Sequence, residues 1–331
     1  MKRPTGWTDD EASGGHAPWL DIIAAESLGV RGLCCRVTLP GRTIVIDPGL
    51  ALGYLRGGLM PHPVQVAVGR RVRQAIVRAL ETATDIVVSH FHGDHVPLVA
   101  ANPYQLSFQD LPPRAGELRC WSKADDPAGP MHQRFLDLKV LFGANLRVAE
   151  GLQDGPLSFS EAVPHGKPGG KTGTVMMTRI LTPRGVFVHA SDIQLLNHEA
   201  VDRILDWRPD IVLAGGPPLY LEVIGPEDRQ AAWNNGLRLA RGVGTLILDH
   251  HLLRSRQGLA WLAELSAAAG RDIPCAADYM KKRRLLLEAD RAQWYRRAPV
   301  PDNWHTDYRL GREGPDRGGQ RFRAPVAQEG K

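Results

Sequence analysis

Cysteine is scarce in this chain, and its few copies do not have the spacing of known metal or disulfide motifs. The 331 residues include four cysteines, Cys34, Cys35, Cys120 and Cys275. No two of them form the CxxC pair of a zinc ribbon. One adjacent pair and two isolated residues also do not suggest the disulfide framework of a small secreted domain. We therefore expect four free, buried thiols.

Long apolar segments are missing as well. No run reaches the eighteen or so apolar residues of a membrane-spanning helix. The opening, MKRPTGWTDDEASGGHAPW, has no apolar stretch after its charged residues, as a secretory signal would have. We expect a cytoplasmic protein without a membrane partner. The sequence carries no sign of the oligomeric state.

Strong charge is absent from most of the chain. The net charge is +5, but residues 1–278 hold 28 Lys or Arg against 29 Asp or Glu, and the rest holds thirteen against seven. The near-neutral body argues weakly against a large nucleic-acid surface, whereas the basic segment argues weakly for one. The run KKRR at 281–284, with Arg291, Arg296 and Arg297, fits either a solvated helix face or a patch that faces nucleic acid.

The chain does have the composition of one folded α/β domain. Apolar residues make up 43% of it, enough for a sizeable core. Residues 1–17 and 299–331 are polar and rich in Gly, Pro and Arg, which predicts disordered tails around a domain at 18–298. Short apolar runs that end in turn residues predict strands. These runs are GLCCRVTL, TIVIDPG, DIVVSH, VMMTRIL, GVFVHASD, DIVLAGGPP and TLILDHH.

Helical periodicity appears between several of these strands. The predicted helices cover 70–83, 226–241, 256–270 and 277–297, and residues 131–141 have the pattern of one more. The least regular segment is 101–150, where LPPRAGE and DDPAG interrupt every pattern. It fits either an insertion that shapes the substrate site or an ordinary surface excursion.

The stretch DIVVSHFHGDHVPLVA at 85–100 places three of the chain's twelve histidines within six positions. His90 and His92 are two apart, so extended backbone directs both side chains to one side, where two imidazoles can converge on one ion. Asp94 and His95 follow Gly93, which permits a tight turn toward a second position nearby. Such crowding is improbable by chance, and it indicates about half of a metal site.

Other apolar runs are followed by further candidate ligands. Two adjacent ions require about seven or eight protein contacts, more than one stretch supplies. The remaining candidates are Asp47 in TIVIDPG, His165 in AVPHGKPGG, Asp192 in VFVHASDIQ, and His250 or His251 in TLILDHHLLR. Each follows a run that predicts a strand, so the ends of strands are expected to complete the site.

The order of these residues resembles the five motifs of the metallo-β-lactamase superfamily. The series is Asp47, His90-x-His92-x-Asp94-His95, His165, Asp192 and His250. The segments AAESLGVRGLCCRV, DPGLALG, PHP and LAGGPPLYL further resemble a little-characterised subfamily of that fold, which lacks an assigned substrate. The resemblance implies a four-layer αββα sandwich with two divalent ions in a cleft between its sheets. Zinc is the first expectation, although these ligand types also suit iron and manganese.

The resemblance also implies a role for each ligand. His90, His92 and His165 would hold one ion, and Asp94, His95 and the last histidine the other, with Asp192 between the two. The LLLTH pattern of tRNA-processing relatives aligns with LILDH and favours His250 as the last histidine, while His251 stays open. Asp47 would hydrogen-bond to the histidine-rich loop and orient its ligands.

The expected chemistry is hydrolysis by a metal-bound hydroxide. Asp94 could orient this nucleophile or take its proton, and His189 or His62 could protonate the leaving group. His189 lies in an apolar run, so the alternative is a buried histidine that is hydrogen-bonded in the core or supports the ligands from behind. Ser27 and Arg31 are candidates for holding an anionic substrate group. We therefore predict a metal-dependent hydrolase of a small or medium ester, lactone or phosphodiester. The alternatives are a nuclease acting on RNA or DNA and a non-catalytic metal-binding protein.

Overall fold

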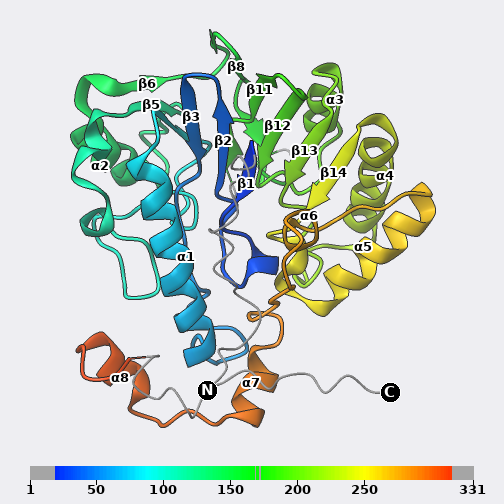
Figure 1. The fold of residues 1–331 in the computed structure, drawn as a ribbon. Helices are drawn as coiled ribbons and strands as arrows, with labels where there is room; N and C mark the ends of the chain where they lie inside the picture. Colours follow the sequence, from blue (N-terminus) through cyan, green and yellow to red (C-terminus); the bar gives the residue numbers. More distant parts are fainter. Residues whose placement is uncertain (1–18, 168, 171–172, 315–331) are drawn as a thin grey trace.

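Two six-stranded β-sheets lie face to face in the computed structural model, which describes residues 19–167, 169–170 and 173–314 (Figure 1). The first sheet contains, in spatial order, β1 (Leu20–Ile22), β2 (Cys35–Leu39), β3 (Arg42–Ile46), β4 (Asp85–Val88), β5 (Arg119–Ser122) and β6 (Leu146–Val148). The second contains β14 (Thr245–Leu248), β13 (Ile211–Ala214), β12 (Gly185–Ser191), β11 (Thr178–Thr182), β8 (Leu157–Phe159) and β7 (Gln153–Asp154). A separate ribbon pairs β9 (Val163–Pro164) with β10 (Thr174–Val175).

Helices cover the outer face of each sheet. The helices are α1 (Pro63–Glu81), α2 (His132–Phe142), α3 (His198–Asp206), α4 (Pro226–Gly242), α5 (Arg256–Ala269), α6 (Ala276–Tyr279), α7 (Arg291–Arg297) and α8 (Trp304–Arg309). Helices α1 and α2 lie outside the first sheet, and α3, α4 and α5 lie outside the second (Figure 1). The predicted four-layer αββα sandwich is confirmed.

The alternation of side chains along the strands explains this layering. Ile44 and Ile46 of β3 point between the sheets and share an apolar cluster with Phe187 of β12. Val45, which lies between them in the sequence, points the other way and shares a second cluster with Ile76 of α1. Both faces of the first sheet are therefore apolar. The second sheet covers one of these faces, and helices such as α1 cover the other.

Parallel pairing brings the carboxyl ends of the central strands together. Strands β3, β4 and β5 run parallel in the first sheet, and β12, β13 and β14 run parallel in the second. The chain leaves β3 at Ile46, β4 at Val88, β12 at Ser191 and β14 at Leu248. The loops that follow carry most of the predicted ligands, so the sheet topology gathers them at one edge of the sandwich.

The helix predicted over 277–297 is wrong. It is divided into α6 and α7 by an irregular segment that begins where Lys281 adopts a left-handed φ of 53°. Within this segment the backbone N–H of Leu285 donates to the carbonyl of Ser27 at 2.7 Å. A contact with the first half of the chain has replaced the hydrogen bonds of a continuous helix.

The tail predicted over 299–331 is wrong for residues 299–314. These residues contain α8, whose Trp304 is 4% exposed and stacks on Tyr308 four positions later. Tyr308 in turn stacks on Tyr104. Buried aromatic rings therefore fix this segment to the first half of the sandwich. The rest of this predicted tail, and the one predicted over 1–17, lie outside the described residues.

Two further expectations differ from the structure. The segment 101–150 supplies β5, α2 and β6, so it completes the first sheet and is neither an insertion nor a surface excursion. The strand predicted in VMMTRIL is two strands, because β10 pairs with β9 and β11 pairs with β8 and β12. Short strands such as β1 and β6 carry too few residues for a sequence pattern to identify them.

Candidate metal centre

The predicted ligands meet at the edge where β4, β12 and β14 end. They are His90, His92, Asp94 and His95 after β4, His165 after β9, Asp192 after β12, and His250 and His251 after β14. Most of these side chains are buried. The side chain of Asp94 is 17% exposed and His92 is half-buried, so the centre opens to solvent beside these two residues.

Asp192 lies at the middle of the cluster. Its Oδ2 atom is 3.1 Å from Nε2 of His165 and 3.0 Å from Nε2 of His251. Its Oδ1 atom is 3.0 Å from Nε2 of His95 and 3.3 Å from Nε2 of His250. The two oxygens of one carboxylate therefore face two different groups of side chains whose nitrogen or oxygen atoms could donate a lone pair to a metal ion. These groups are called the two groups of donors below.

The first group of donors, on the Oδ2 side, consists of four imidazoles. Nε2 of His90 lies 3.4 Å from Oδ2 of Asp192 and 3.0 Å from Nδ1 of His92. Nε2 of His165 lies 3.0 Å from Nε2 of His251. The second group, on the Oδ1 side, contains a carboxylate as well.

In this second group, Oδ2 of Asp94 lies 3.5 Å from Nε2 of His250. Nε2 of His95 lies 3.4 Å from the same nitrogen. The adjacent residues His250 and His251 thus point to opposite oxygens of Asp192. The sequence leaves one of the two open as the ligand, whereas the structure brings both into the cluster.

The donors in this cluster fit metal ions. Imidazole nitrogens that approach one another to 3.0 Å either share an N–H···N hydrogen bond or point their lone pairs at a common cation, because a neutral ring has one N–H and one lone pair. Within the described part of the chain, Oδ1 of Asp192 is buried without a hydrogen-bond donor. Nitrogen and carboxylate donors in this mixture suit zinc and similar divalent ions.

Asp47 holds the histidine-rich loop from behind. Its Oδ1 accepts from the backbone N–H of Ser89 at 2.8 Å, and its Oδ2 lies 2.9 Å from Nδ1 of His95. The hydroxyl of Ser191, next to Asp192, also donates to this Oδ2 at 3.0 Å. One carboxylate therefore ties loops from both sheets together, which is the orienting role that the resemblance implies for it.

The backbone is tightly turned where these loops leave their strands. Asp47, Ser191 and His250 have left-handed φ values of 48°, 51° and 41°. Such values are uncommon for residues other than glycine and cluster at functional sites. Gly49 packs directly on the backbone of His95, so any side chain at position 49 would collide with the histidine-rich loop.

For most of these ligands, electrostatic interactions favour the protonation states that bind metal; His95 is the exception, because Asp192 and Asp47 raise its pKa against the effect of burial. Burial on its own would raise the pKa of Asp47, but the hydrogen bond with His95 and the neighbouring histidines lower it to about 2. His95 also lowers the pKa of Asp94 and that of Asp192, against the effect of burial. Burial lowers the pKa of His250 to about 4. Ionised carboxylates and neutral imidazoles are the forms that ligate ions.

Arg254 lies against the second group of donors although no motif points to it. Its Nη2 atom is 3.2 Å from Oδ2 of Asp94 and 2.8 Å from Nε2 of His250. On its other side, Nε is 3.5 Å from Oε2 of Glu26, and burial raises the pKa of this carboxyl to about 8. The position of Arg254, four residues after His250 in DHHLLR, is the sequence signal that could have identified it.

Two of the residues predicted to bind substrate or to act as an acid are buried in structural roles. Ser27 is fully buried, and its hydroxyl accepts from the backbone N–H of Ala277 at 2.9 Å. His62 is also fully buried and caps α1, with Nε2 2.9 Å from the carbonyl of Ala298. Both side chains are engaged by other parts of the chain, so these contacts give no support to their predicted roles.

Arg31, predicted to bind substrate, and His189, predicted as an acid, also have partners away from the cluster. The guanidinium of Arg31 forms an ion pair with the buried carboxylate of Glu288, and Nε of Arg31 donates to it at 2.7 Å. His189 is fully buried, and its Nε2 lies 2.8 Å from the carbonyl of Leu33. His189 therefore packs behind the centre, where it cannot reach a leaving group.

The basic run at 281–284 does not form the helix face that was one of its two interpretations. It lies in the irregular segment between α6 and α7, and all four side chains are exposed. Arg284 forms hydrogen bonds from Nε and Nη2 to the carboxylate of Asp278.

None of the helices in the described part of the chain has the length and the apolar character that a membrane-spanning helix needs.

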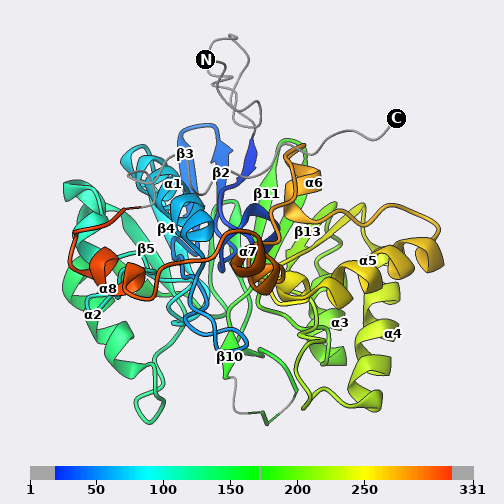
Figure 2. The same ribbon diagram turned by 90° about the horizontal axis from the view of Figure 1, so that it is seen from below.

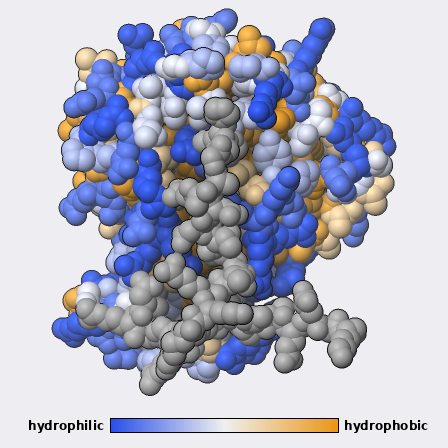
Figure 3. Space-filling view, viewed as in Figure 1, coloured by the Kyte–Doolittle hydropathy of each residue, from blue (hydrophilic) through white to orange (hydrophobic). Residues whose placement is uncertain are grey.

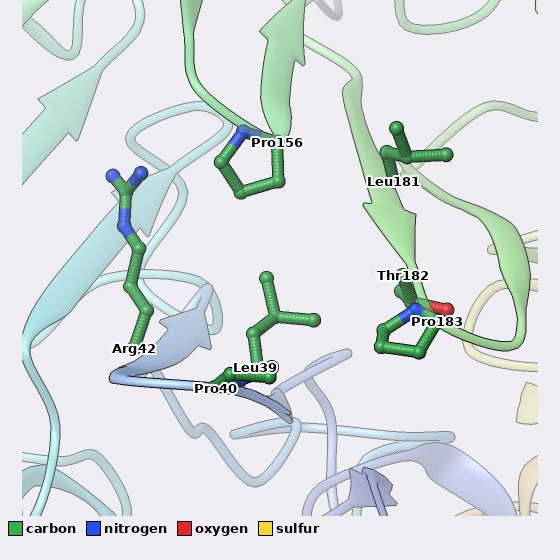
Figure 4. A pocket seen from close by; sticks show the side chains of 7 residues that line it. All are labelled: Leu39, Pro40, Arg42, Pro156, Leu181, Thr182 and Pro183. Carbon is green, nitrogen blue, oxygen red and sulfur yellow. The ribbon is translucent and has the colours of Figure 1, made fainter.

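A cavity lies at the opposite edge of the sheets. It measures about 400 Å³ and is lined by Leu39, Arg42 and Thr182, among others (Figure 4). These residues lie at the far ends of β3 and β11 from the metal centre, in the turns where the strands reverse. The guanidinium of Arg42 is engaged by Asp85 and Asp154. This cavity is therefore separate from the chemistry of the cluster.

Comparison with known proteins gives close relatives in sequence and more distant ones in structure. A UPF0282 protein of Methanosarcina mazei is 47% identical over 296 residues, 89% of this chain and 97% of that protein. A UPF0282 protein of Thermococcus onnurineus is 33% identical, with 83% and 94% covered. No model of a known protein family matches.

Among solved structures, an isothiocyanate hydrolase from Delia radicum gut bacteria has a TM-score of 0.46 and 17% identity, covering 77% of this chain and 94% of that one. A metal-dependent hydrolase of the β-lactamase superfamily has a TM-score of 0.43 and 11% identity over the same shares. At such TM-scores the likeness adds nothing to the sheet order and the ligand cluster described above.

The αββα sandwich and the cluster of histidines and aspartates at its edge are the fold and the site that the resemblance to the metallo-β-lactamase superfamily implies. The sequence matches are long enough and close enough to establish the family of the chain. The chain belongs to the UPF0282 family.

Proposed function

We propose that this protein is a metal-dependent hydrolase with two adjacent divalent ions. The supporting observation is that the two oxygens of Asp192 face two separate groups of donors. Two ions held there would lower the pKa of a bound water and polarise the bond to be cleaved, so no serine or cysteine nucleophile is needed. Zinc is the proposed metal because histidine nitrogens dominate the donor set.

His90, His92, His165 and His251 are proposed to hold the first ion, together with Oδ2 of Asp192. This assignment uses all four imidazoles on that side of the carboxylate. The second ion would be held by Asp94, His95, His250 and Oδ1 of Asp192. His250 and His251 thus both become ligands, one for each ion.

The second ion is proposed to be the more weakly held of the two. The backbone N–H of Gly32 donates to Nδ1 of His250 at 3.2 Å. In a neutral ring this places the proton on Nε2, the atom that faces Asp192, so ligation requires that the hydrogen bond be given up. The guanidinium of Arg254, 2.8 Å from the same nitrogen, also opposes a second cation.

Asp94 is proposed to orient the attacking water or to take its proton, besides binding metal. It is the most suitable residue because its side chain is partly exposed at the open side of the centre. The surrounding ligands are buried, so the reacting bond has to enter at this side. Such a narrow approach favours a small or medium substrate with an ester, lactone or phosphodiester bond.

Metal analysis combined with a substrate panel tests this proposal. We expect about two ions per purified chain after adventitious metal has been removed, and hydrolysis of at least one lactone, thioester or phosphodiester. Asp94→Ala should lose the second ion and the activity, because it removes both a ligand and the group that orients water. Inductively coupled plasma mass spectrometry and initial rates measure the two quantities.

Asp228→Ala is the matched control for Asp94→Ala. Asp228 is half-buried in the first turn of α4, where it accepts from the backbone N–H of Gly225 and pairs with Lys167; it is not one of the proposed ligands, so its loss should change neither metal content nor rate. The proposal fails if the metal-free wild-type chain hydrolyses substrate as fast as the loaded one. It also fails if no ion binds at all.

The adjacent histidines allow the two ion sites to be separated. His251→Ala should weaken the more tightly bound ion, whereas His250→Ala should retain that ion and lose the weaker one. Loss of a ligand should weaken the affected ion by about 100-fold, at the upper end of the range for residues that support metal ligands. Competition against a zinc-binding indicator gives both dissociation constants.

Each variant of this pair serves as the control for the other, because both remove an imidazole at the end of β14. Identical titrations of the two variants would contradict the assignment of one histidine to each ion. A titration of His251→Ala that matches the wild type would remove His251 from the ligand set.

A further inference from the structure

Arg254 is a buried cation that faces the open side of the proposed metal centre. It ends the short 3-10 helix η5 (Leu252–Arg254), directly after the two histidines, and its side chain is 8% exposed. Its Nη2 atom lies close to Asp94 and His250, and Nη1 lies 3.5 Å from the hydroxyl of Tyr220. The guanidinium is therefore held between the centre and the loop that follows β13.

Metal binding would remove the acceptor that Nη2 has in this arrangement. This acceptor, Oδ2 of Asp94, belongs to the second group of proposed ligands, as does Nε2 of His250, which lies 2.8 Å from Nη2. A lone pair that ligates an ion is no longer available to accept a hydrogen bond. Nε of Arg254 is itself buried without a hydrogen-bond acceptor among the described residues. A buried guanidinium with unmatched N–H groups is costly unless an oxygen acceptor replaces what it has lost.

The surroundings of Arg254 leave one direction from which this acceptor can come. Glu26 occupies the Nε side, at 3.5 Å, and is fully buried. Tyr220 occupies the Nη1 side, and the guanidinium of Arg56 lies 4.1 Å over its ring. Nη2 therefore faces the exposed side of Asp94, where substrate has to enter.

Arg56 adds a second positive charge at this entrance. It lies between β3 and α1, and its Nη2 donates to the carbonyl of Arg254 at 2.9 Å. An approaching anion would meet Arg56 first and then Arg254 beside the ions. Clustered cations of this kind concentrate anionic ligands, and a planar guanidinium can give two parallel hydrogen bonds to a phosphate or carboxylate.

From this geometry we propose that Arg254 binds an oxyanion of the substrate, a phosphate or a carboxylate, next to the second ion. The inference rests on the proposed function, because the second ion takes from Arg254 its acceptor on Asp94. Arg254 is then a substrate-binding residue, and the substrate is an anion. Among the bonds considered above, a phosphodiester or an ester that carries a carboxylate has this property, and a neutral lactone does not.

Binding of inorganic phosphate to the zinc-loaded protein tests the proposal without any turnover. Isothermal titration calorimetry should detect phosphate binding to the wild type, and Arg254→Gln should weaken it by about ten-fold or more, the loss expected for a hydrogen bond to a charged group. A parallel titration with acetate distinguishes the two sources of oxyanion. If phosphate binds more strongly than acetate, the oxyanion of the substrate is assigned as a phosphoester. If acetate binds more strongly, it is assigned as a carboxylate.

Arg256→Gln is the matched control for the calorimetry. Arg256 lies two residues further on, is exposed, and pairs with Asp290, so its loss should leave phosphate affinity unchanged. Equal phosphate affinity of Arg254→Gln and wild type, at equal zinc content, overturns the proposal. A zinc-loaded wild type that binds neither phosphate nor acetate overturns it too, while leaving the metal centre itself intact.

Zinc content, measured on every sample, separates this inference from the proposed function. A wild type that holds no zinc contradicts the metal centre, and the inference falls with it. Where Arg254→Gln loses zinc or does not fold, Arg254→Lys decides. The ammonium group keeps the charge but cannot give two parallel hydrogen bonds, so phosphate affinity should fall about three- to ten-fold. Unchanged affinity in a zinc-loaded lysine variant overturns the proposal.

Discussion

Asp192→Ala is expected to deprive the centre of both ions and to lower hydrolytic activity by about 10³-fold or more. The reason is the position of this one carboxylate between two groups of donors, with His165 and His251 on Oδ2 and His95 and His250 on Oδ1. Alanine removes a ligand from each ion and leaves several imidazoles facing an empty space. Metal analysis after gel filtration and initial rates on the best substrate measure the two effects.

Asp202→Ala is a suitable control for this variant. Asp202 is exposed on α3 and forms an ion pair with Arg238, so metal content and rate should stay at the wild-type level. Circular dichroism shows whether Asp192→Ala has kept the fold. An Asp192→Ala protein that is folded, holds both ions and turns over normally would exclude the bridging role.

Asp85→Ala should produce the largest loss of stability away from the centre, about 3–5 kcal/mol in the free energy of unfolding. Asp85 begins β4 and is fully buried, and its oxygens accept from Arg42 at 2.8 and 2.9 Å and from Trp121 at 2.9 Å. Alanine leaves the mostly buried guanidinium of Arg42 without its main partner. Urea unfolding in the presence of a chelator gives the difference, because the chelator removes any contribution from bound metal.

Asp154→Ala provides the comparison, since Asp154 pairs with the same arginine from a side chain that is 36% exposed. Its loss should cost at most about 1 kcal/mol, as for other surface ion pairs. Similar losses of stability in Asp85→Ala and Asp154→Ala would show that burial does not decide how much each ion pair of Arg42 contributes.

The stabilisation by Asp85 should also depend on pH in a defined direction. Burial alone would raise the pKa of Asp85, but hydrogen bonds from Arg42, Thr84 and Trp121 lower it. A carboxyl whose pKa is lower in the folded state stabilises the fold above its unfolded pKa of about 3.9, and this contribution is lost as the pH falls through the folded value. The difference between wild type and Asp85→Ala should therefore persist at pH 7 and shrink below about pH 4.

Much of the candidate metal centre can be predicted because most of its ligands directly follow apolar runs that are recognisable as strands in the sequence. His90 and His92 follow an apolar strand directly, and Asp192 and His250 follow strands of the other sheet. Parallel strands bring their carboxyl ends to one edge, so residues that are far apart in the sequence meet without any knowledge of loop structure. The αββα fold could be predicted for a different reason, through the resemblance carried by the ordered series of motifs.

Residues whose roles depend on distant contacts could not be predicted in this way. The role of Ser27 is decided by the amide of residue 277 and that of His62 by the carbonyl of residue 298, and no local pattern connects these groups to them. Arg254 resembles any other arginine near a helix until its neighbours Asp94 and Glu26 are known. For such side chains, tertiary packing decides the role and local propensity does not.

The segment from α6 to α8 has a consequence for the order in which the molecule is made. Glu288 pairs with Arg31, and Arg291 donates to the carbonyl of Gly53 at 2.6 Å and to the side chain of Gln65 at 3.0 Å. Ribosomal synthesis proceeds from the N-terminus, and domains form as their parts emerge. The loop before α1 is therefore synthesised well before its partner Arg291, which lies 238 residues after Gly53. Until then its polar backbone groups depend on water or chaperones, and a stalled or shortened chain would expose it to proteolysis.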